Sequence, residues 1–368
     1  MKLQQLTFTR FLAAILIVLY HLPSQTLHNL PGFGLVLQKM PALVSYFFLL
    51  SGFILVISTA SGTGAFNRIS RRQFWINRFA RIYPLYLFAF LATSFLDYFT
   101  NTILLPWGLV TYIPEVTLTH AWVSAWVPTS NYPSWSISVE VVFYLLFPSL
   151  LNWLISKRSS GIIFFACLSW VVNQLIYAYC FNDGMPANVC LYFPLLHLST
   201  FIGGVCTGIL TVRHWQILNT RHSANIILGI FLIFLALAMY LIGIQHPLMN
   251  YYHDGLLAPL FIALILFLAT QHGALARWLS HPKFIYLGEI SYGIYLLQIP
   301  VGKALSVINS HYLHLKPWQY APVYISALLL ISSFCYELIE TPARSFIRRW
   351  FSPAIQVKQP LEQERVTA

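Results

Sequence analysis

Ten apolar stretches, each long enough to cross a lipid bilayer, dominate this chain of 368 residues. They cover residues 6–22, 42–60, 82–99, 137–156, 161–180, 194–212, 223–243, 255–271, 287–306 and 319–338. Only 8% of the residues are charged, against about 25% in a typical soluble domain. The pattern predicts an all-α protein, a polytopic membrane helix bundle of about ten transmembrane helices that forms one domain over residues 1–349.

Lysine and arginine are distributed unequally between the segments that join these stretches. With the N-terminus placed in the cytoplasm, 18 of the 21 basic residues fall on the cytoplasmic side, as the positive-inside rule requires. Both termini are therefore predicted to be cytoplasmic, with residues 350–368 as a polar, disordered tail. The net charge is +11, but the basic residues lie in short clusters between apolar segments, so no nucleic-acid partner is expected.

The first apolar stretch carries two ionisable residues, Arg10 and His21, in "TRFLAAILIVLYHLP". Eleven residues make close to three helical turns, so both side chains project from nearly the same face, roughly 16 Å apart along the axis. Two interpretations fit. Arg10 could reach the inner headgroups while His21 lies at the outer interface, or both could serve a function inside the membrane, where ionisable groups are costly.

The fourth stretch begins with "PSWSISVEVVFYLLFP". The topology places Glu140 at a depth similar to that of His21, with Tyr144 one turn further on the same face. A carboxylate facing a histidine could fix its tautomer and raise its basicity, so that the imidazole takes a proton from a hydroxyl. Alternatively, Glu140 could cap the start of its helix. The sequence leaves both interpretations open.

Five arginines occur within residues 68–81, in "RISRRQFWINRFARIYPLY". Arg78 and Arg81 are three residues apart and share a helix face. Paired guanidinium groups suit phosphates through forked hydrogen bonds. Basic residues at this position also suit an anchor for anionic lipid headgroups, so the pattern alone does not separate the two roles.

The ninth stretch contains "LGEISYGIYLLQIP", in which small residues alternate with Tyr292 and Tyr295. Small residues favour close helix packing, and the tyrosines could donate hydrogen bonds into a cavity. Elsewhere, four histidines lie in loops or at helix boundaries without the spacing of metal ligands. They are His120, His197, His246 and His253. No metal site and no role for these histidines is expected.

Taken in chain order, these segments and "FFLLSGF" at residues 47–53 resemble the acyltransferase-3 family, bacterial membrane proteins with about ten core spans, many of which O-acylate carbohydrates. The resemblance runs from about residue 5 to residue 349. Its most specific parts are the Arg-x10-His element of the first stretch and the WS-x-S-x-E element of the fourth. It implies a membrane fold. Some members also carry an outer esterase-like domain, and none is expected in this chain.

The resemblance also implies roles for particular residues. The implied catalytic residues are His21 as general base, Glu140 and Arg10. The implied donor-binding residues are Arg78, Arg81, Ser51 and Gly52. Trp135 matches the tryptophan of the fourth-span element, and together with Tyr144, Tyr292 and Tyr295, whose hydroxyl groups could donate into a cavity, it is a candidate for binding the acceptor. One position departs from the family pattern: Gln298 stands where the family often has histidine, and since glutamine cannot act as a base, no catalytic role is expected there.

The implied reaction moves an acyl group, acetyl in the commonest case, from cytoplasmic acyl-CoA to a hydroxyl of a cell-surface or lipid-linked carbohydrate such as O-antigen or exopolysaccharide. Acyl-CoA would be a co-substrate, with no tightly bound cofactor, and the enzyme would lie among the lipids of the bacterial inner membrane. The residues alone also allow a proton-coupled transporter of a small metabolite. That alternative predicts repeat symmetry between the halves of the chain, and the sequence shows none.

Overall fold

The computed structural model describes residues 3–22, 30–60, 65–67, 70–100, 112–123, 131–182 and 184–351. Within these ranges the chain is helical almost throughout, and its only β feature is an isolated antiparallel bridge between Ala60 and Phe66. The predicted all-α class is confirmed. The tail from residue 352 onward lies outside the described residues.

Every one of the ten apolar stretches lies in a helix. The main helices are α1 (Gln5–His21), α4 (Ala42–Thr59), α5 (Arg71–Phe99), α7 (Trp135–Leu154), α8 (Ser159–Asn182), α10 (Leu198–Arg213), α12 (Arg221–Gly243), α13 (Ala258–Ala269), α15 (Pro282–Ile308) and α16 (Pro317–Cys335). In the described part of the chain, eight helical segments are long and apolar enough to cross a membrane. A ninth results if η6 (Pro247–Asp254) and α13, which meet at 60°, form one span. With the shorter α1, these agree with about ten spans.

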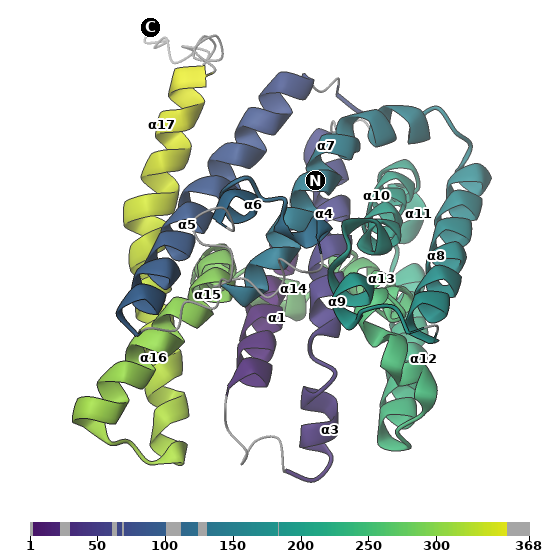
Figure 1. Ribbon diagram of the computed structural model, residues 1–368. Helices are drawn as coiled ribbons and strands as arrows, with labels where there is room; N and C mark the ends of the chain where they lie inside the picture. The colour runs from purple at the N-terminus through teal and green to yellow at the C-terminus, as the bar shows by residue number, and fades with distance from the viewer. Residues whose placement is uncertain are drawn as a thin grey trace, which may run out of the picture.

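Short elements connect or extend these helices. They are α3 (Phe33–Leu37), α6 (Tyr112–Val116), η2 (His120–Trp122), η4 (Tyr132–Ser134), α9 (Ala187–Tyr192), η5 (Pro194–His197), α11 (Trp215–Leu218), α14 (Ala274–Leu279), η7 (Asn309–Leu313), η8 (Tyr336–Glu340) and α17 (Thr341–Phe351). In Figure 1, α17 lies at the edge of the bundle and its far end points towards the top of the view. The cytoplasmic position of both termini stays a prediction.

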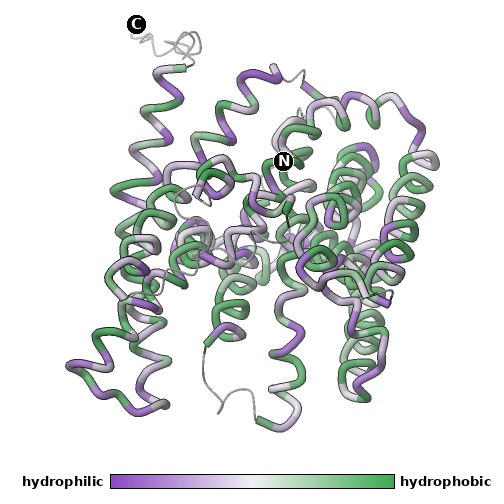
Figure 2. Tube along the Cα trace, viewed as in Figure 1, coloured by the Kyte–Doolittle hydropathy of each residue, from purple (hydrophilic) through white to green (hydrophobic). Residues whose placement is uncertain are grey.

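The hydropathy of each helix reflects its surroundings in the bundle. Figure 2 shows hydrophobic colouring along the long helices and hydrophilic colouring at the upper end of α5. Apolar side chains on α8 and α12 are largely exposed, with Phe164 at 68% and Ile233 at 69%. Apolar groups in such number on a protein surface are stable only in a lipid environment, so these two helices are the natural lipid-facing side of the bundle.

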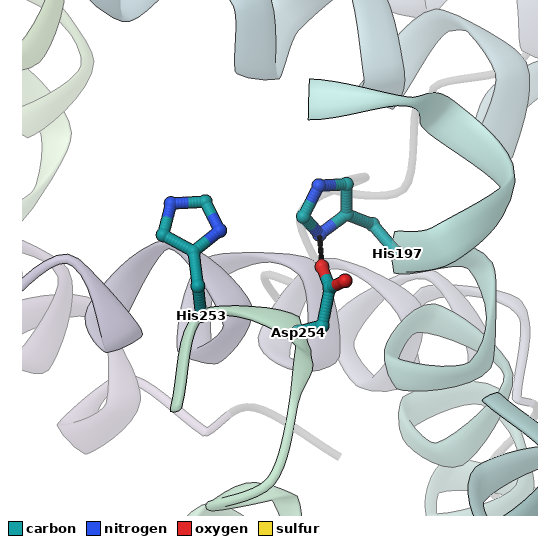
Figure 3. Close-up of side chains that lie close together, drawn as sticks. All are labelled: His197, His253 and Asp254. Carbon is teal, nitrogen blue, oxygen red and sulfur yellow. Dashed lines mark ion pairs between the residues drawn. The ribbon is translucent and has the colours of Figure 1, made fainter. Parts of the chain in front are cut away.

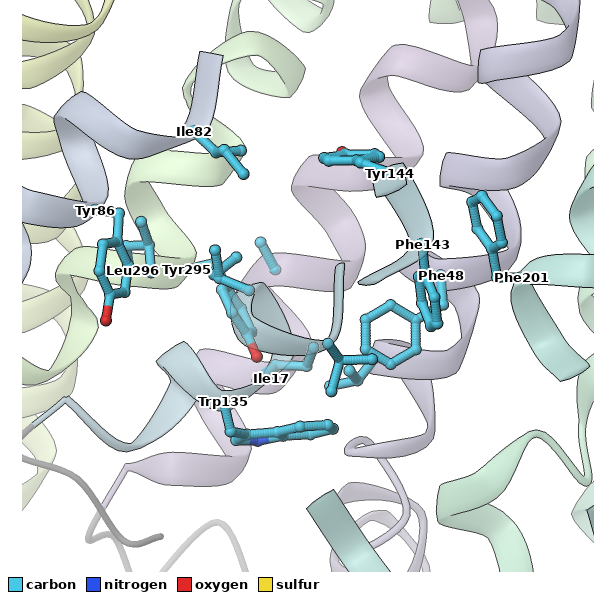
Figure 4. Packing of buried hydrophobic residues seen from close by; sticks show 14 of the residues in the cluster. Ile17, Phe48, Ile82, Tyr86, Trp135, Phe143, Tyr144, Phe201, Tyr295 and Leu296 are labelled. Atoms are coloured by element: carbon cyan, nitrogen blue, oxygen red, sulfur yellow. The ribbon is translucent and has the colours of Figure 1, made fainter. Parts of the chain in front are cut away.

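The interior of the bundle is built on two close helix pairs, α4 with α10 and α1 with α15. At the first crossing, a Cβ atom on Gly52 would lie 2.5 Å from the carbonyl oxygen of Phe201 and 2.9 Å from the backbone nitrogen of Val205. Small residues permit this approach of two backbones. Beside the crossing, Phe143 stacks on Phe201 and meets Phe48 edge to face, with centroids 4.6 and 5.1 Å apart (Figure 4).

Two prolines inside helices release backbone carbonyls that side chains then bind. Proline has no N–H to donate to the carbonyl four residues earlier. Pro148 of α7 thereby frees the Tyr144 carbonyl, which accepts from Trp75 Nε1 at 3.1 Å. Pro300 of α15 frees the Leu296 carbonyl in the same way, and Asn131 donates to it at 3.0 Å. These bonds tie neighbouring elements to α7 and α15, two of the helices that carry the candidate site.

Candidate functional site

A pocket with about 870 Å³ of empty volume lies between the helices and collects most of the residues singled out from the sequence. Its polar lining comes from α1, α4, α5, α7 and α15: Arg10, Ser51, Arg78, Arg81, Ser136, Glu140, Tyr144, Ser291, Tyr292 and Tyr295. Apolar side chains of α4 complete the wall. We call this the arginine pocket. It unites candidate residues of the first, second, fourth and ninth apolar stretches with the arginine pair.

Glu140 is held inside the arginine pocket by two hydroxyl groups. Ser51 donates to its Oε1 at 2.9 Å, and the Tyr144 hydroxyl donates to the same oxygen. The side chain of Arg78 lies over the Tyr144 ring, with its central carbon 5.8 Å from the ring centroid. Glu140 is therefore a fixed negative group on the wall of a cationic pocket.

The three guanidinium groups of this pocket outnumber its single carboxylate. Within the described residues, none of Arg10, Arg78 and Arg81 forms an ion pair, and Arg78 Nε is buried without a hydrogen-bond partner. Arginine left unpaired in a protein interior is rare because the charge is costly to desolvate. The arrangement suits a ligand with phosphate or carboxylate groups, which guanidinium forks bind well.

A second pocket, of about 510 Å³ of empty volume, contains His21. Aromatic side chains surround the imidazole, and the pocket is lined by Ile17, Tyr20, His21, Pro41, Val44, Tyr132, Pro133, Trp135, Leu191, Tyr192, Tyr252, His253 and Tyr295. We call this the histidine pocket. Val44 and Tyr295 line both pockets. These two side chains are therefore the partition between the arginine pocket and the histidine pocket.

His21 is oriented by the side chain of Gln298, with Nδ1 and Oε1 2.8 Å apart. Gln298 Nε2 donates to the Tyr295 carbonyl at 2.7 Å, so its oxygen is the atom that faces the imidazole. An amide oxygen only accepts, and His21 Nδ1 must therefore carry the proton. The other ring nitrogen, Nε2, is left with a free lone pair, which is the form that a general base needs.

The interpretation in which Glu140 faces His21 is wrong, and so is the one in which it caps its helix. Glu140 belongs to the arginine pocket and its partners are Ser51 and Tyr144. The helix α7 begins at Trp135, which lies in the histidine pocket. Five residues at about 1.5 Å each then carry the chain away from His21 before Glu140 is reached.

The candidate acceptor-binding residues divide between the pockets. Trp135 lines the histidine pocket, Tyr295 lies in the partition, and Tyr144 and Tyr292 belong to the arginine pocket. The hydroxyl of Tyr292 donates to the Ile82 carbonyl at 2.9 Å. Gly52 lines neither pocket and lies at the crossing of α4 with α10. The functional roles of these residues stay predictions.

The geometry agrees with comparisons to known proteins. A family model described as an acyltransferase domain, that of the acyltransferase-3 family, matches residues 3–337. The chain belongs to this family. It is thus a multi-pass membrane O-acyltransferase, an enzyme that has an acyl donor and an acceptor, and the transporter alternative is not supported. No solved structure matches the chain.

Two relatives illustrate where the chain stands within the acyltransferase-3 family. The acyltransferase MdmB of Streptomyces mycarofaciens is 26% identical over 380 residues, which cover 95% of this chain and 93% of MdmB. The O-acetyltransferase OatA of Staphylococcus aureus is 24% identical over 367 residues, which cover 91% of this chain. The chain spans 56% of the length of OatA.

Within this acyltransferase-3 chain, sequence reasoning underrated Gln298. The sequence predicts no catalytic role for glutamine at this position, whereas the structure places the amide oxygen 2.8 Å from His21 Nδ1. In the segment "SYGIYLLQIP", the place of Gln298 close to a proline is the feature that indicates a role for it. Pro300 interrupts the regular hydrogen bonding of α15 near residue 296. A polar side chain next to this interruption is a candidate for hydrogen bonding to another helix.

Three further buried residues, His197, His253 and Asp254, were also missed (Figure 3). Their spacing along the chain resembles no metal motif, and His197 lies far from the other two in sequence. The adjacent pair His253–Asp254 lies in a polar connecting segment, where ionisable residues are common, so the sequence holds no clear signal for this cluster.

Proposed function

We propose that this acyltransferase moves an acyl group, acetyl in the simplest case, from acyl-CoA in the arginine pocket to a carbohydrate hydroxyl in the histidine pocket. The observation that carries the proposal is the partition. Val44 and Tyr295 line both pockets, so a donor on one side and an acceptor on the other would have their reacting groups at one thin wall.

The charge of the arginine pocket supports acyl-CoA as the donor. Coenzyme A carries phosphate groups, and Arg10, Arg78 and Arg81 form no ion pair within the described chain. Guanidinium groups bind phosphate oxygens in a forked geometry that a lysine cannot reproduce. Apolar side chains of α4 in the same pocket suit the pantetheine arm, which would point its thioester towards the partition.

The lining of the histidine pocket supports a carbohydrate as the acceptor. Tyr20, Tyr132, Trp135, Tyr192 and Tyr252 surround His21 there. Aromatic faces suit the apolar faces of sugar rings, and tyrosine hydroxyls suit their hydroxyl groups. The acceptor would be a cell-surface or lipid-linked glycan of the O-antigen or exopolysaccharide type, reached from the outer side of the bacterial inner membrane, with both chain termini in the cytoplasm.

The chemical step follows from the tautomer of His21. Its unprotonated Nε2 takes the proton of the acceptor hydroxyl as the oxygen attacks the thioester carbonyl. The new C–O bond forms, the C–S bond breaks, and the coenzyme A thiolate leaves. The imidazolium then returns its proton to the thiolate. No bound cofactor takes part, because the acyl-CoA itself supplies the activated group.

The test is acyl transfer in membranes that contain the protein, with radiolabelled acetyl-CoA and an isolated surface glycan as acceptor. We expect His21→Ala to lose at least about a hundredfold in rate, the usual contribution of a general base. His222→Ala, at an exposed position on α12, is the matched control and should transfer label normally. Label transfer by His21→Ala at the wild-type rate would refute the assignment of the base.

A further inference from the structure

His197, at the end of η5, meets His253 and Asp254, at the end of η6, inside the protein (Figure 3). One possible ligand atom from each of the three side chains lies within 4.8 Å of the others. The side chains of His197 and Asp254 are fully buried, and His253 is 8% exposed. Two imidazoles and one carboxylate thus converge at a point that water does not reach freely.

The contact between His197 and Asp254 requires a proton or a cation between the two side chains. His197 Nε2 lies 3.0 Å from the Leu191 carbonyl, which can only accept, so Nε2 carries a proton. His197 Nδ1 lies 2.9 Å from Asp254 Oδ1. In a neutral ring this nitrogen would direct a lone pair at the carboxylate. A proton on His197 Nδ1, a proton on Asp254 Oδ1, or a bound cation must therefore lie between the two atoms.

A proton between His197 Nδ1 and Asp254 Oδ1, on either atom, does not account for the rest of the cluster. His253 Nδ1 and Asp254 Oδ2 are buried without a hydrogen-bond partner, and neither would gain one from that proton. No lysine or arginine of the described chain pairs with Asp254. Buried polar atoms without partners are costly. A cation bound by all three side chains would satisfy these atoms at once.

Two hydroxyl groups next to this cluster of His197, His253 and Asp254 also lack a hydrogen-bond partner. Thr200 Oγ1 lies against Gly255, next to Asp254 in the chain, and Tyr177 interacts electrostatically with Asp254. Both hydroxyls are buried without a partner. They could bind a water molecule or support the carboxylate, as groups around metal ligands commonly do.

We propose that His197, His253 and Asp254 bind a divalent transition-metal ion, zinc being the best match. Two imidazole nitrogens and one carboxylate oxygen form a common zinc ligand set, which leaves a fourth position open. The bond from His197 Nε2 to the Leu191 carbonyl is the outer contact that metal-bound histidines typically make. The inference depends on these contacts and not on the role proposed for His21.

The metal site forms part of the wall of the histidine pocket, which His253 lines. The indole of Trp135 stacks on His253, with centroids 5.5 Å apart at 30°, and lies 5.1 Å from His197. A bound ion would hold both imidazoles in place beneath Trp135 and so fix the shape of the pocket wall.

The test is the metal content of the full-length protein, purified in detergent, incubated with excess zinc chloride and freed of unbound ion. We expect about one zinc ion per chain in the wild type and in His222→Ala, the control outside the cluster. Asp254→Asn and His253→Gln should each bind less zinc, with an affinity roughly tenfold lower than that of the wild type. X-ray absorption of the bound zinc should show nitrogen and oxygen ligands and no sulfur.

Folding is checked separately from metal binding. Adding zinc to chelator-treated wild type should raise its melting temperature, whereas the same zinc concentration should raise that of His253→Gln clearly less. Wild-type protein that binds less than about a tenth of an ion per chain would overturn the proposal in favour of a proton-bridged His197–Asp254 pair. Sulfur ligands, or full zinc binding by both variants, would overturn it as well by placing the ion elsewhere.

Discussion

His21 on α1 and Gln298 on α15 are 277 residues apart in the chain and are joined by a hydrogen bond of 2.8 Å. The bond fixes both the orientation of the imidazole and its tautomer, since the amide oxygen accepts from Nδ1–H. It also links two helices that pack closely along each other. The residue that prepares the candidate base is thus a neutral amide, without the charge of a carboxylate.

Replacing Gln298 should change catalysis through His21. Gln298→Leu leaves Nδ1–H without an acceptor, and we expect kcat to fall roughly tenfold or more because the base loses its orientation. Gln298→Glu restores an acceptor and adds a negative charge, which favours the imidazolium form. Its pH–rate profile should therefore shift to higher pH. A Gln298→Leu protein with wild-type kcat, or a Gln298→Glu profile that does not shift, would show that the bond only supports packing.

Replacing Arg78 should weaken donor binding. Arg78→Gln removes a charged donor, and a charge-assisted hydrogen bond is worth roughly 1.5–3 kcal/mol, so KM for acyl-CoA should rise about ten- to a hundredfold. Arg78→Lys keeps the charge without the fork and should fall between Arg78→Gln and the wild type. Steady-state kinetics with varied acyl-CoA measure the effect, with Arg277→Gln, an exposed position on α14, as control. An equal rise in Arg277→Gln would point to a general surface effect.

Changing the size of the side chain at position 44 should change how easily the acyl group passes from the arginine pocket to the histidine pocket. Val44→Phe adds volume where the two pockets meet, and we expect acyl transfer to fall strongly while acyl-CoA still binds in the arginine pocket. Val44→Ala should widen the passage and improve the use of longer acyl donors relative to acetyl-CoA. Transfer rates for a series of acyl-CoA chain lengths test both expectations. An unaltered chain-length profile in both variants would mean that the acyl group does not cross at Val44.

Enlarging Gly52 should destabilise the protein. Gly52→Val would place atoms against the Phe201 carbonyl and the Val205 backbone, and overpacking of this kind costs typically 1–3 kcal/mol. The melting temperature in detergent should drop by several degrees, since stability changes of this size commonly do so. Gly203→Ala is the control, because a Cβ there meets nothing within 4 Å. A Gly52→Val protein that melts normally but does not bind acyl-CoA would instead support the donor-binding role.

The loop histidine His120 should make stability depend on pH. Burial in the segment before α7 lowers the pKa of His120 from 6.5 to about 4. Below pH 6.5 the unfolded chain binds a proton that the folded protein does not, so stability is complete above that pH and is lost down to about pH 4. His120→Gln should flatten the fall of melting temperature over this range. An unchanged slope would show that other groups cause it.

The membrane-spanning helices and the candidate residues within them can be predicted from the sequence because hydropathy is a local property. A run of apolar residues must be helical in lipid whatever its neighbours are, since its backbone groups have no other partners. For the same reason the unusual residues within the runs, Arg10, His21, Glu140 and the arginine pair, could be selected as candidates before any contact was known.

Which side chains contact one another is determined only by the tertiary structure. The depth of Glu140 relative to His21 depends on where α7 begins, and α7 begins at Trp135, directly after the short turn η4 and two residues before the predicted start. The packing of α15 against α1 brings Gln298 to His21, and His253 and Asp254, at the end of η6 before its bend into α13, meet His197. Packing of helices, set by small residues and prolines at their crossings, determines these encounters, and no local pattern encodes them.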